Sequence, residues 1–327
     1  AANDSPARVT STLNVVKTSL DLGQTDNIKQ SLKRLSADMN ELPPTLDTAN
    51  KWLGLGQLYR TEVQSKVIPA TSRLEALSAY NNALNMADID KDLALRAFSN
   101  GYLGELYEDE QRYEDALNYT REALFYAQEL ADDTLLYRWQ WQVARLQKAQ
   151  GKTKASLESY RQAVATLNRS RTSLTLGAGI NFKQSVGPVF YEFADLLLTQ
   201  SSGITNEKTK QAALQEVIDV LEAVKLAEVE DYFDSECVLL PEQKIKLSDI
   251  NTDSAIIYPV LLADRTELIV QLPGDIKQFS SPVKAADLRD TVNLFRQQVE
   301  EFDPDHSYLG SAQLLYNWLI KPAEQAL

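Results

Sequence analysis

The amino-acid sequence predicts a mainly α-helical protein, with a solenoid of antiparallel helix pairs over residues 1–200 and a small α+β module over residues 201–327. An internal repeat predicts the solenoid. Strand-like segments after residue 250 predict a short antiparallel β-meander in the module. The charges change between the same two parts: residues 1–200 carry 24 acidic and 22 basic side chains, whereas residues 201–327 carry 22 and 11. The polar stretch 201–206 is therefore the expected boundary.

Three segments of the sequence align when the sequence is shifted by 40 residues, the separation of Leu77 and Leu117. The positions that recur are Leu77, Leu117 and Leu157, then Ala83, Ala123 and Ala163. With their aligned neighbours they fall at i, i+1, i+4, i+7 and i+8, which is one face of a helix. The preceding helices align as well, because the same shift brings Leu103 and Leu106 onto Val143 and Leu146. Each unit is therefore a pair of antiparallel helices, joined by a short turn at positions such as 150–151.

One helix pair cannot bury its own apolar face, so successive pairs must stack into a superhelix. This pattern resembles the tetratricopeptide repeat (TPR), in a long form of about 40 residues. Gly54 and Gly56 fall inside a helix of the first full unit, where we expect them to make room for a neighbouring helix. Residues 5–20 and 28–39 predict one further, degenerate helix pair.

The last third of the chain changes character. Residues 207–232 have a helical pattern, and residues 255–262 and 266–272 read as two strands. Residues 276–279 are a candidate third strand, and two helices are expected at about 285–302 and 308–326. A sheet of this kind, with helices on one side, has an uncovered edge, which is a liability in an isolated module.

The order of several segments carries a second resemblance. Residues 137–142 (YRWQWQ), 226–233 (LAEVEDYF) and 315–322 (LYNWLIKP) resemble cyanobacterial-type proteins that join TPRs to a CHAT domain, a caspase-like domain found with such repeats. The resemblance covers about residue 96 to the end. It implies that the catalytic His and Cys of the family would lie beyond the helix that contains Lys321 and Pro322. No catalytic residue of the family therefore maps onto this chain, and we expect no catalysis in it.

Other patterns that could indicate chemistry have simpler explanations. Cys237 and His306, the single Cys and the single His, both lie in acidic surroundings, which disfavour a reactive thiolate. Gly177 and Gly179 are expected in a loop with no strand before them, so they do not predict a phosphate cradle. The acidic cluster lacks the spacing of a calcium loop and is more typical of a solvated helix end; its members are Glu228, Glu230, Asp231, Asp234 and Glu236.

Composition excludes several further functions. The formal net charge of -13 argues against nucleic acid or an anionic membrane surface as the main partner. One Cys and one His exclude an internal disulfide and Cys- or His-rich metal sites, and we expect no cofactor. Apolar runs do not reach the roughly 18 residues of a spanning helix, so membrane insertion is not expected. The chain begins at Ala1 without a leader pattern, so we expect it to be processed or cut from a longer protein.

The remaining candidate site is the groove of the superhelix, which in the TPR family is lined by the first helix of each pair. By that resemblance the expected lining is Arg60, Glu105, Glu108, Arg138, Trp141, Arg145 and Lys148. Because Arg grips carboxylates and Arg and Trp are favoured interface anchors, the hypothesis is an acidic protein or peptide segment bound at the third repeat. The plain alternative is a solvated polar face with Trp141 packed into the core.

Three functional interpretations follow. The preferred one is an interaction and regulatory segment of a TPR–CHAT protein that binds a protein or peptide partner in the repeat groove. The second is a part of a cysteine peptidase whose His and Cys lie beyond Leu327. The third is a sensor, in which a peptide or small molecule bound in the groove shifts the superhelix.

Overall fold

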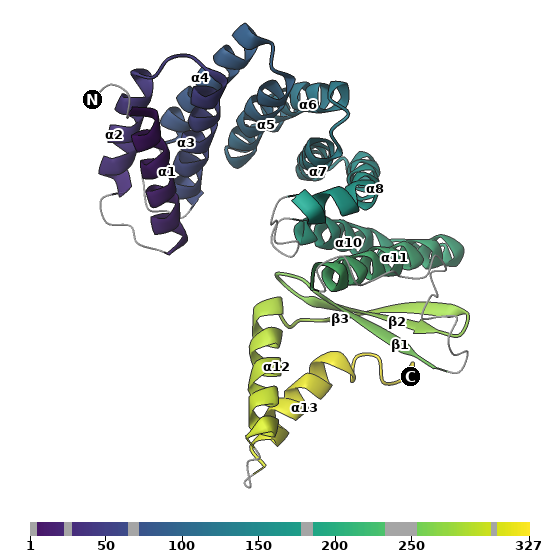
Figure 1. Ribbon diagram of the computed structural model, residues 1–327. Helices are drawn as coiled ribbons and strands as arrows, with labels where there is room; N and C mark the ends of the chain where they lie inside the picture. Colours follow the sequence, from purple (N-terminus) through teal and green to yellow (C-terminus); the bar gives the residue numbers. More distant parts are fainter. Residues whose placement is uncertain (1–4, 23–27, 65–71, 178–185, 233–253, 302–305) are drawn as a thin grey trace. The chain divides into compact units, whose positions relative to one another are not determined.

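The computed structural model describes residues 5–22, 28–64, 72–177, 186–232, 254–301 and 306–327. The chain divides into two compact units, Ala1–Ser170 and Arg171–Leu327. The described residues form a mainly helical, TPR-like repeat solenoid with a small three-stranded antiparallel sheet in the C-terminal part, as predicted (Figure 1).

The first unit is a succession of helix pairs. Its helices are α1 (Ser5–Asp21), α2 (Ile28–Asn40), α3 (Leu46–Gln64), α4 (Ser72–Asp90), α5 (Leu93–Asp109), α6 (Tyr113–Glu129), α7 (Asp133–Ala149) and α8 (Thr153–Gly177), the last of which continues past Ser170 into the second unit. We call α1, α3, α5 and α7, the first helix of each pair, the A helices. The degenerate pair predicted at the start of the chain is α1 and α2. Because α8 runs to Gly177, that glycine ends a helix and does not lie in the predicted loop, whereas Gly179 lies outside the described residues.

The aligned positions are the core of this unit. Ala83, Ala123 and Ala163 are fully buried, and so are Leu103 and Leu146 on the preceding helices. Small side chains at the centre of a helix let two backbones approach closely, which is why alanine recurs there. The repeat alignment therefore predicted the packing positions correctly.

A turn of one kind recurs at even intervals and sets the period of the solenoid. Lys91, Gln111, Ala131 and Gly151 each have a positive φ, between 51° and 72°. After each of them an amide donates to the carbonyl five residues earlier, for example Asp92 to Ala87 and Lys152 to Gln147. This is the left-handed C-terminal motif that usually uses glycine. Only one of the four residues is a glycine, so sequence reasoning found only the turn at Gly151.

The two glycines of α3 differ in what surrounds them. A Cβ added at Gly56 would overlap the ring of Tyr80 on α4, so this glycine makes room for a neighbour as predicted. A Cβ added at Gly54 would have nothing within 4 Å. The prediction that Gly54 also makes room for a helix was wrong, because the space beside it is open.

This difference predicts stability changes of opposite sign. Gly54→Ala should stabilise the protein by about 0.5–1 kcal/mol, because Ala is the better helix former and no atom opposes its methyl group. Gly56→Ala should destabilise it by about 1–3 kcal/mol, because the added methyl displaces the fully buried Tyr80. Urea unfolding of the two variants measures both effects, and shifts of the same sign would contradict the assignment.

The second unit combines a helix pair, a sheet and two further helices. Its elements are α10 (Gly187–Ser201), α11 (Glu207–Tyr232), β1 (Ile256–Leu261), β2 (Thr266–Leu272), β3 (Asp275–Ser281), α12 (Ala285–Glu300) and α13 (Tyr308–Leu319). All three predicted strands are present, in the order β1-β2-β3 and antiparallel. The final helix ends at Leu319, before the predicted end at 326, and turns lead to Leu327. The polar stretch 201–206 begins at the last residue of α10 and runs to the start of α11, so the proposed boundary at residue 200 falls inside this unit.

Both edges of the sheet have a feature that opposes pairing with another strand. The amide of Leu262 donates to the carbonyl of Arg265 (2.9 Å), so the backbone groups of Leu262 point toward β2. Because successive residues of a strand point their backbone groups to opposite sides, the nitrogen of Pro259 faces the open edge. Proline has no N–H to offer there. On β3 the side chain of Gln211 accepts from the amide of Ile276 (2.9 Å) and donates to its carbonyl (3.0 Å). The uncovered edge predicted from the sequence is thus blocked at β1 and partly capped at β3.

Candidate partner-binding site

The residues predicted to line the groove lie on three successive A helices, where several of them bind one another. Arg60 on α3 forms an ion pair with Glu105 on α5, and its Nε lies 2.6 Å from a carboxylate oxygen of Asp109. The side chains of Arg60 and Glu105 are only 18% and 15% exposed. The pair therefore joins the first two full repeats in a setting where water screens the charges little.

A second ion pair joins α5 to α7. Arg145 donates from Nε and one Nη to the two carboxylate oxygens of Glu108, each at 2.9 Å, in the bidentate geometry that makes such pairs strong. The same guanidinium lies 4.3 Å from the centre of the Trp141 ring. Trp141 is half-buried and Lys148, one turn after Arg145, is exposed. The charged groups of the predicted site are thus engaged within the repeat array.

The sequence alignment relates these two ion pairs to each other. Arg60 and Glu108 occupy the position after the aligned tyrosines of their repeats, and Glu105 aligns with Arg145. The two ion pairs therefore use the same two repeat positions. At the first interface the earlier repeat supplies the arginine, and at the second interface it supplies the glutamate. A repeat placed next to the wrong neighbour would bring like charges together, so these pairs favour the native order of repeats.

Arg138, the remaining arginine of the predicted lining, lies over aromatic rings. Its guanidinium lies over the rings of Tyr102 and Trp139, at 5.6 and 5.3 Å from their centres. Trp139 is fully buried and packs directly on the backbone of Gly101. The core tryptophan of α7 is therefore Trp139. Trp141, which the plain alternative to a binding groove placed in the core, lies half-buried under Arg145.

Burial and neighbouring charge shift the protonation equilibria along this face. Burial opposes the charge on Arg60, yet the carboxylates of Glu105 and Asp109 raise the pKa of its guanidinium above the ordinary value. Burial raises the pKa of the Tyr80 hydroxyl, and Arg60 acts in the opposite direction. Burial also opposes the charge on Arg138, but Tyr102 and Glu105 raise its pKa. These arginines therefore stay charged at any physiological pH.

A cavity of about 580 Å³ opens between α1, α3 and α5. Its apolar lining is Leu13, Leu20, Leu58 and Tyr102, and its polar lining is Thr10, Asn14, Lys17, Asp21, Asp47, Asn50, Lys51, Gln57 and Thr61. The remaining lining residue is Gly54, beside which a side chain would find open space. The cavity thus lies on the A-helix side of the solenoid, and its lining residues do not include those of α7, where the third full repeat begins.

The charges in this cavity are balanced. Two lysines and two aspartates line it, and the ammonium of Lys51 forms an ion pair with Asp47 one turn earlier on α3. The side chain of Lys51 is 9% exposed, whereas that of Asp47 is 70% exposed. The cavity therefore offers apolar contact with a neutral polar rim, and no strong preference for a charged ligand. Sequence reasoning missed it because α1 belongs to the weakly patterned first pair.

The other predicted features do not form a site among the described residues. His306 is exposed and has a positive φ of 56°, while Cys237 lies outside the described residues. The side chains of the acidic cluster, from Glu228 to Glu236, also lie outside them. Within the described ranges, groups of three His, Cys, Asp or Glu side chains suited to a metal ion do not occur.

Several solved structures have a similar helical-repeat fold. The TPR-like repeats of a putative kinesin light chain from Podosopora anserina match 69% of this chain and 97% of their own, with 14% identity and a TM-score of 0.47. BtubC from P. vanneervenii matches 76% and 89%, with 13% identity and a TM-score of 0.48. PilF from Pseudomonas aeruginosa matches 72% and 89%, with 18% identity and a TM-score of 0.41. At this level of identity the likeness concerns the fold alone.

No protein-family profile and no curated protein sequence matches the chain. The resemblance of residues 96–327 to TPR–CHAT proteins therefore stays a prediction from the sequence. In the part of the chain that the structure describes, every helix is too short or too polar to cross a lipid bilayer.

Proposed function

We propose that this chain is a protein-interaction scaffold that holds an extended segment of a partner protein on its A-helix face. The observation that carries the proposal is the cavity between α1, α3 and α5, which lies on this face and is open at Gly54. Its volume of about 580 Å³ falls in the range of typical ligand pockets. Stacked repeats form extended surfaces of this kind, which other repeat proteins use for binding.

The lining of the cavity suggests what the partner offers. Leu58 and the half-buried Leu13, Leu20 and Tyr102 supply apolar contact, so the central group of the partner is a large apolar side chain. Amide and hydroxyl side chains around it can hydrogen-bond to the backbone of an extended segment. Because acidic and basic residues are equal in number here, a strongly charged segment gains little.

The ion pairs between A helices give this site its support. Arg60 and Arg145 are already bound to carboxylates of the neighbouring repeat, so an acidic partner segment at the third repeat would have to displace Glu105, Asp109 or Glu108. We propose that these residues fix the spacing of the A helices and leave the partner contacts to others. Trp141 and Lys148, on the same face of α7, extend the surface beyond the cavity.

A glycine substitution with a matched control tests this site. Gly54→Gln should fill the cavity, and Gly310→Gln introduces the same side chain at a helical glycine of α13 that also has nothing within 4 Å. Peptides selected on the wild-type chain from a displayed random library serve as probes. We expect their affinity to fall at least tenfold with Gly54→Gln and to be unchanged with Gly310→Gln, as measured by fluorescence anisotropy.

Two results would contradict the proposal. One is a selected peptide set that binds the Gly54→Gln variant as tightly as the wild type. The other is equal weakening by the two substitutions, because that would reflect a general effect of the added side chain. Circular dichroism on both variants separates loss of binding from loss of fold.

We further propose, from the sequence resemblance alone, that residues 201–327 belong to the junction and first part of a CHAT domain. This proposal rests on the order of the segments at 137–142, 226–233 and 315–322. It predicts that the reading frame continues past Leu327 into strands that end in a His and a Cys. A frame that stops at Leu327 would contradict it, and the gene sequence decides between the two.

A further inference from the structure

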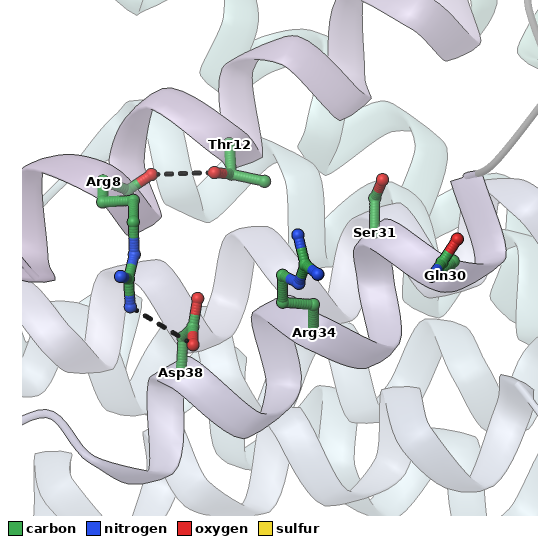
Figure 2. A pocket seen from close by; sticks show the side chains of 6 residues that line it. All are labelled: Arg8, Thr12, Gln30, Ser31, Arg34 and Asp38. Atoms are coloured by element: carbon green, nitrogen blue, oxygen red, sulfur yellow. Dashed lines mark hydrogen bonds and ion pairs between the residues drawn. The ribbon is translucent and has the colours of Figure 1, made fainter.

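A second cavity, of about 430 Å³, lies between α1 and α2 and is lined by polar and charged residues. The six lining residues are Arg8, Thr12, Gln30, Ser31, Arg34 and Asp38. Arg8 and Thr12 are one turn apart on α1, while Ser31, Arg34 and Asp38 share one face of α2. Figure 2 shows the guanidinium of Arg34 pointing from α2 into the space between the helices, between Ser31 and the Arg8–Asp38 pair.

The hydrogen-bond donors of this cavity are only partly used. Nη2 of Arg8 lies 3.3 Å from Oδ1 of Asp38, and the hydroxyl of Thr12 donates to the carbonyl of Arg8 at 2.9 Å (Figure 2). Arg34, Ser31 and Gln30 have no hydrogen-bond or ion-pair partner for their side chains among the residues described by the structure. A guanidinium, a hydroxyl and an amide thus face one cavity with donors to spare.

The two helices that form this cavity carry a net positive charge, whereas the whole chain is acidic. Helices α1 and α2 together carry five basic and two acidic side chains, against a net charge of -13 for the whole sequence. The one carboxylate in the lining, that of Asp38, is held to one side by Arg8. The open part of the cavity is therefore electropositive, which attracts anions to this part of an otherwise acidic protein.

We propose that this cavity binds a phosphoryl group, either free phosphate or a phosphate monoester carried by a partner. Arg34 supplies two parallel N–H donors to two phosphate oxygens, which is the arrangement that makes Arg a preferred phosphate ligand. Ser31 and Gln30 supply donors to the third oxygen. Arg8, on α1, breaks its ion pair with Asp38 and binds the phosphate instead. A carboxylate has two oxygens and one charge, so it would leave part of this donor set unused.

Isothermal titration calorimetry of the full chain at low ionic strength tests this site. The probes are inorganic phosphate, N-acetyl-phosphoserine amide and, as a carboxylate, N-acetylglutamate amide. We expect saturable binding of the phosphate-bearing probes and at least tenfold weaker binding of the carboxylate. The tighter of the two phosphate probes identifies the source as free phosphate or a modified side chain. Binding of N-acetyl-phosphoserine amide should weaken from pH 7.5 to pH 5.5, because its phosphate monoester gains its second proton near pH 6.

Paired variants locate the binding. Arg34→Gln should weaken the phosphate-bearing probes at least tenfold, whereas Lys33→Gln removes the same charge from an exposed neighbour outside the cavity and should change affinity less than threefold. Asp38→Asn should tighten binding by removing the competing carboxylate. The proposal is overturned if neither phosphate probe binds saturably, if the carboxylate binds as tightly, or if the two charge-removing variants lose equal affinity. None of the substituted residues lines the cavity between α1, α3 and α5. The phosphate proposal and the proposed scaffold function can therefore be contradicted separately.

Discussion

Replacing Trp139 with Ala is expected to destabilise the repeat unit by about 3–5 kcal/mol, the largest effect of any single substitution considered. The indole is fully buried and lies directly on the backbone of Gly101. It meets the rings of Phe98 and Tyr102 edge-on, at 6.4 and 6.0 Å between centres. Truncation would open a cavity between α5 and α7 that the helices can close only by shifting, and Arg138 would lose the ring beneath it.

Trp141 provides the matched control for this prediction. It lies two residues further along α7 but is half-buried under Arg145, so Trp141→Ala should cost only about 1 kcal/mol. Urea unfolding followed by far-ultraviolet circular dichroism compares the two variants. Equal losses of stability would contradict the assignment of Trp139 as the core residue.

The second large effect is expected at the ion pair between α5 and α7. Arg145→Glu should destabilise the protein by about 2 kcal/mol, because it sets two carboxylates against each other at a site where Glu108 is only 19% exposed. The double variant Glu108→Arg with Arg145→Glu restores opposite charges in the order that Arg60 and Glu105 already use at the previous interface. It should recover most of the lost stability.

A double-mutant cycle measures this coupling directly. The single variants, the double variant and the wild type are unfolded in urea at low and at high salt. A coupling free energy near zero would show that the ion pair does not hold the repeats together. A coupling that persists at high salt is expected from the partial burial of the pair.

The repeat could be predicted from the sequence because its signal comes from packing. Positions such as Ala83 and Leu103 must be small or apolar in every unit, so they recur at the repeat spacing and are buried in the structure. The turns at Lys91, Gln111 and Ala131 could not be predicted, because residues other than glycine adopt the left-handed conformation there. Tertiary packing of the helices on either side overrides the local preference at these three positions.

The candidate site was predictable only in part. The TPR resemblance placed Arg60, Glu105, Glu108 and Arg145 on the first helices of their pairs, and the structure shows that these side chains form ion pairs with one another. A sequence alignment does not give the rotation of one helix against the next, so it could not show that these residues pair with one another. The cavity was missed for a related reason. It depends on α1 and on the open space at Gly54, and a glycine that faces empty space has the same sequence signature as one that faces Tyr80.

Site-directed photo-crosslinking tests the central proposal, that a partner segment lies in the cavity between α1, α3 and α5. A photoreactive side chain is placed at Thr61, which lines the cavity on α3, and in a second protein at Gln128, which is exposed on α6. A selected peptide should crosslink to the protein labelled at position 61 and give no crosslink at position 128. Crosslinking at position 128 in place of position 61 would place the partner outside the cavity and contradict the proposed scaffold site.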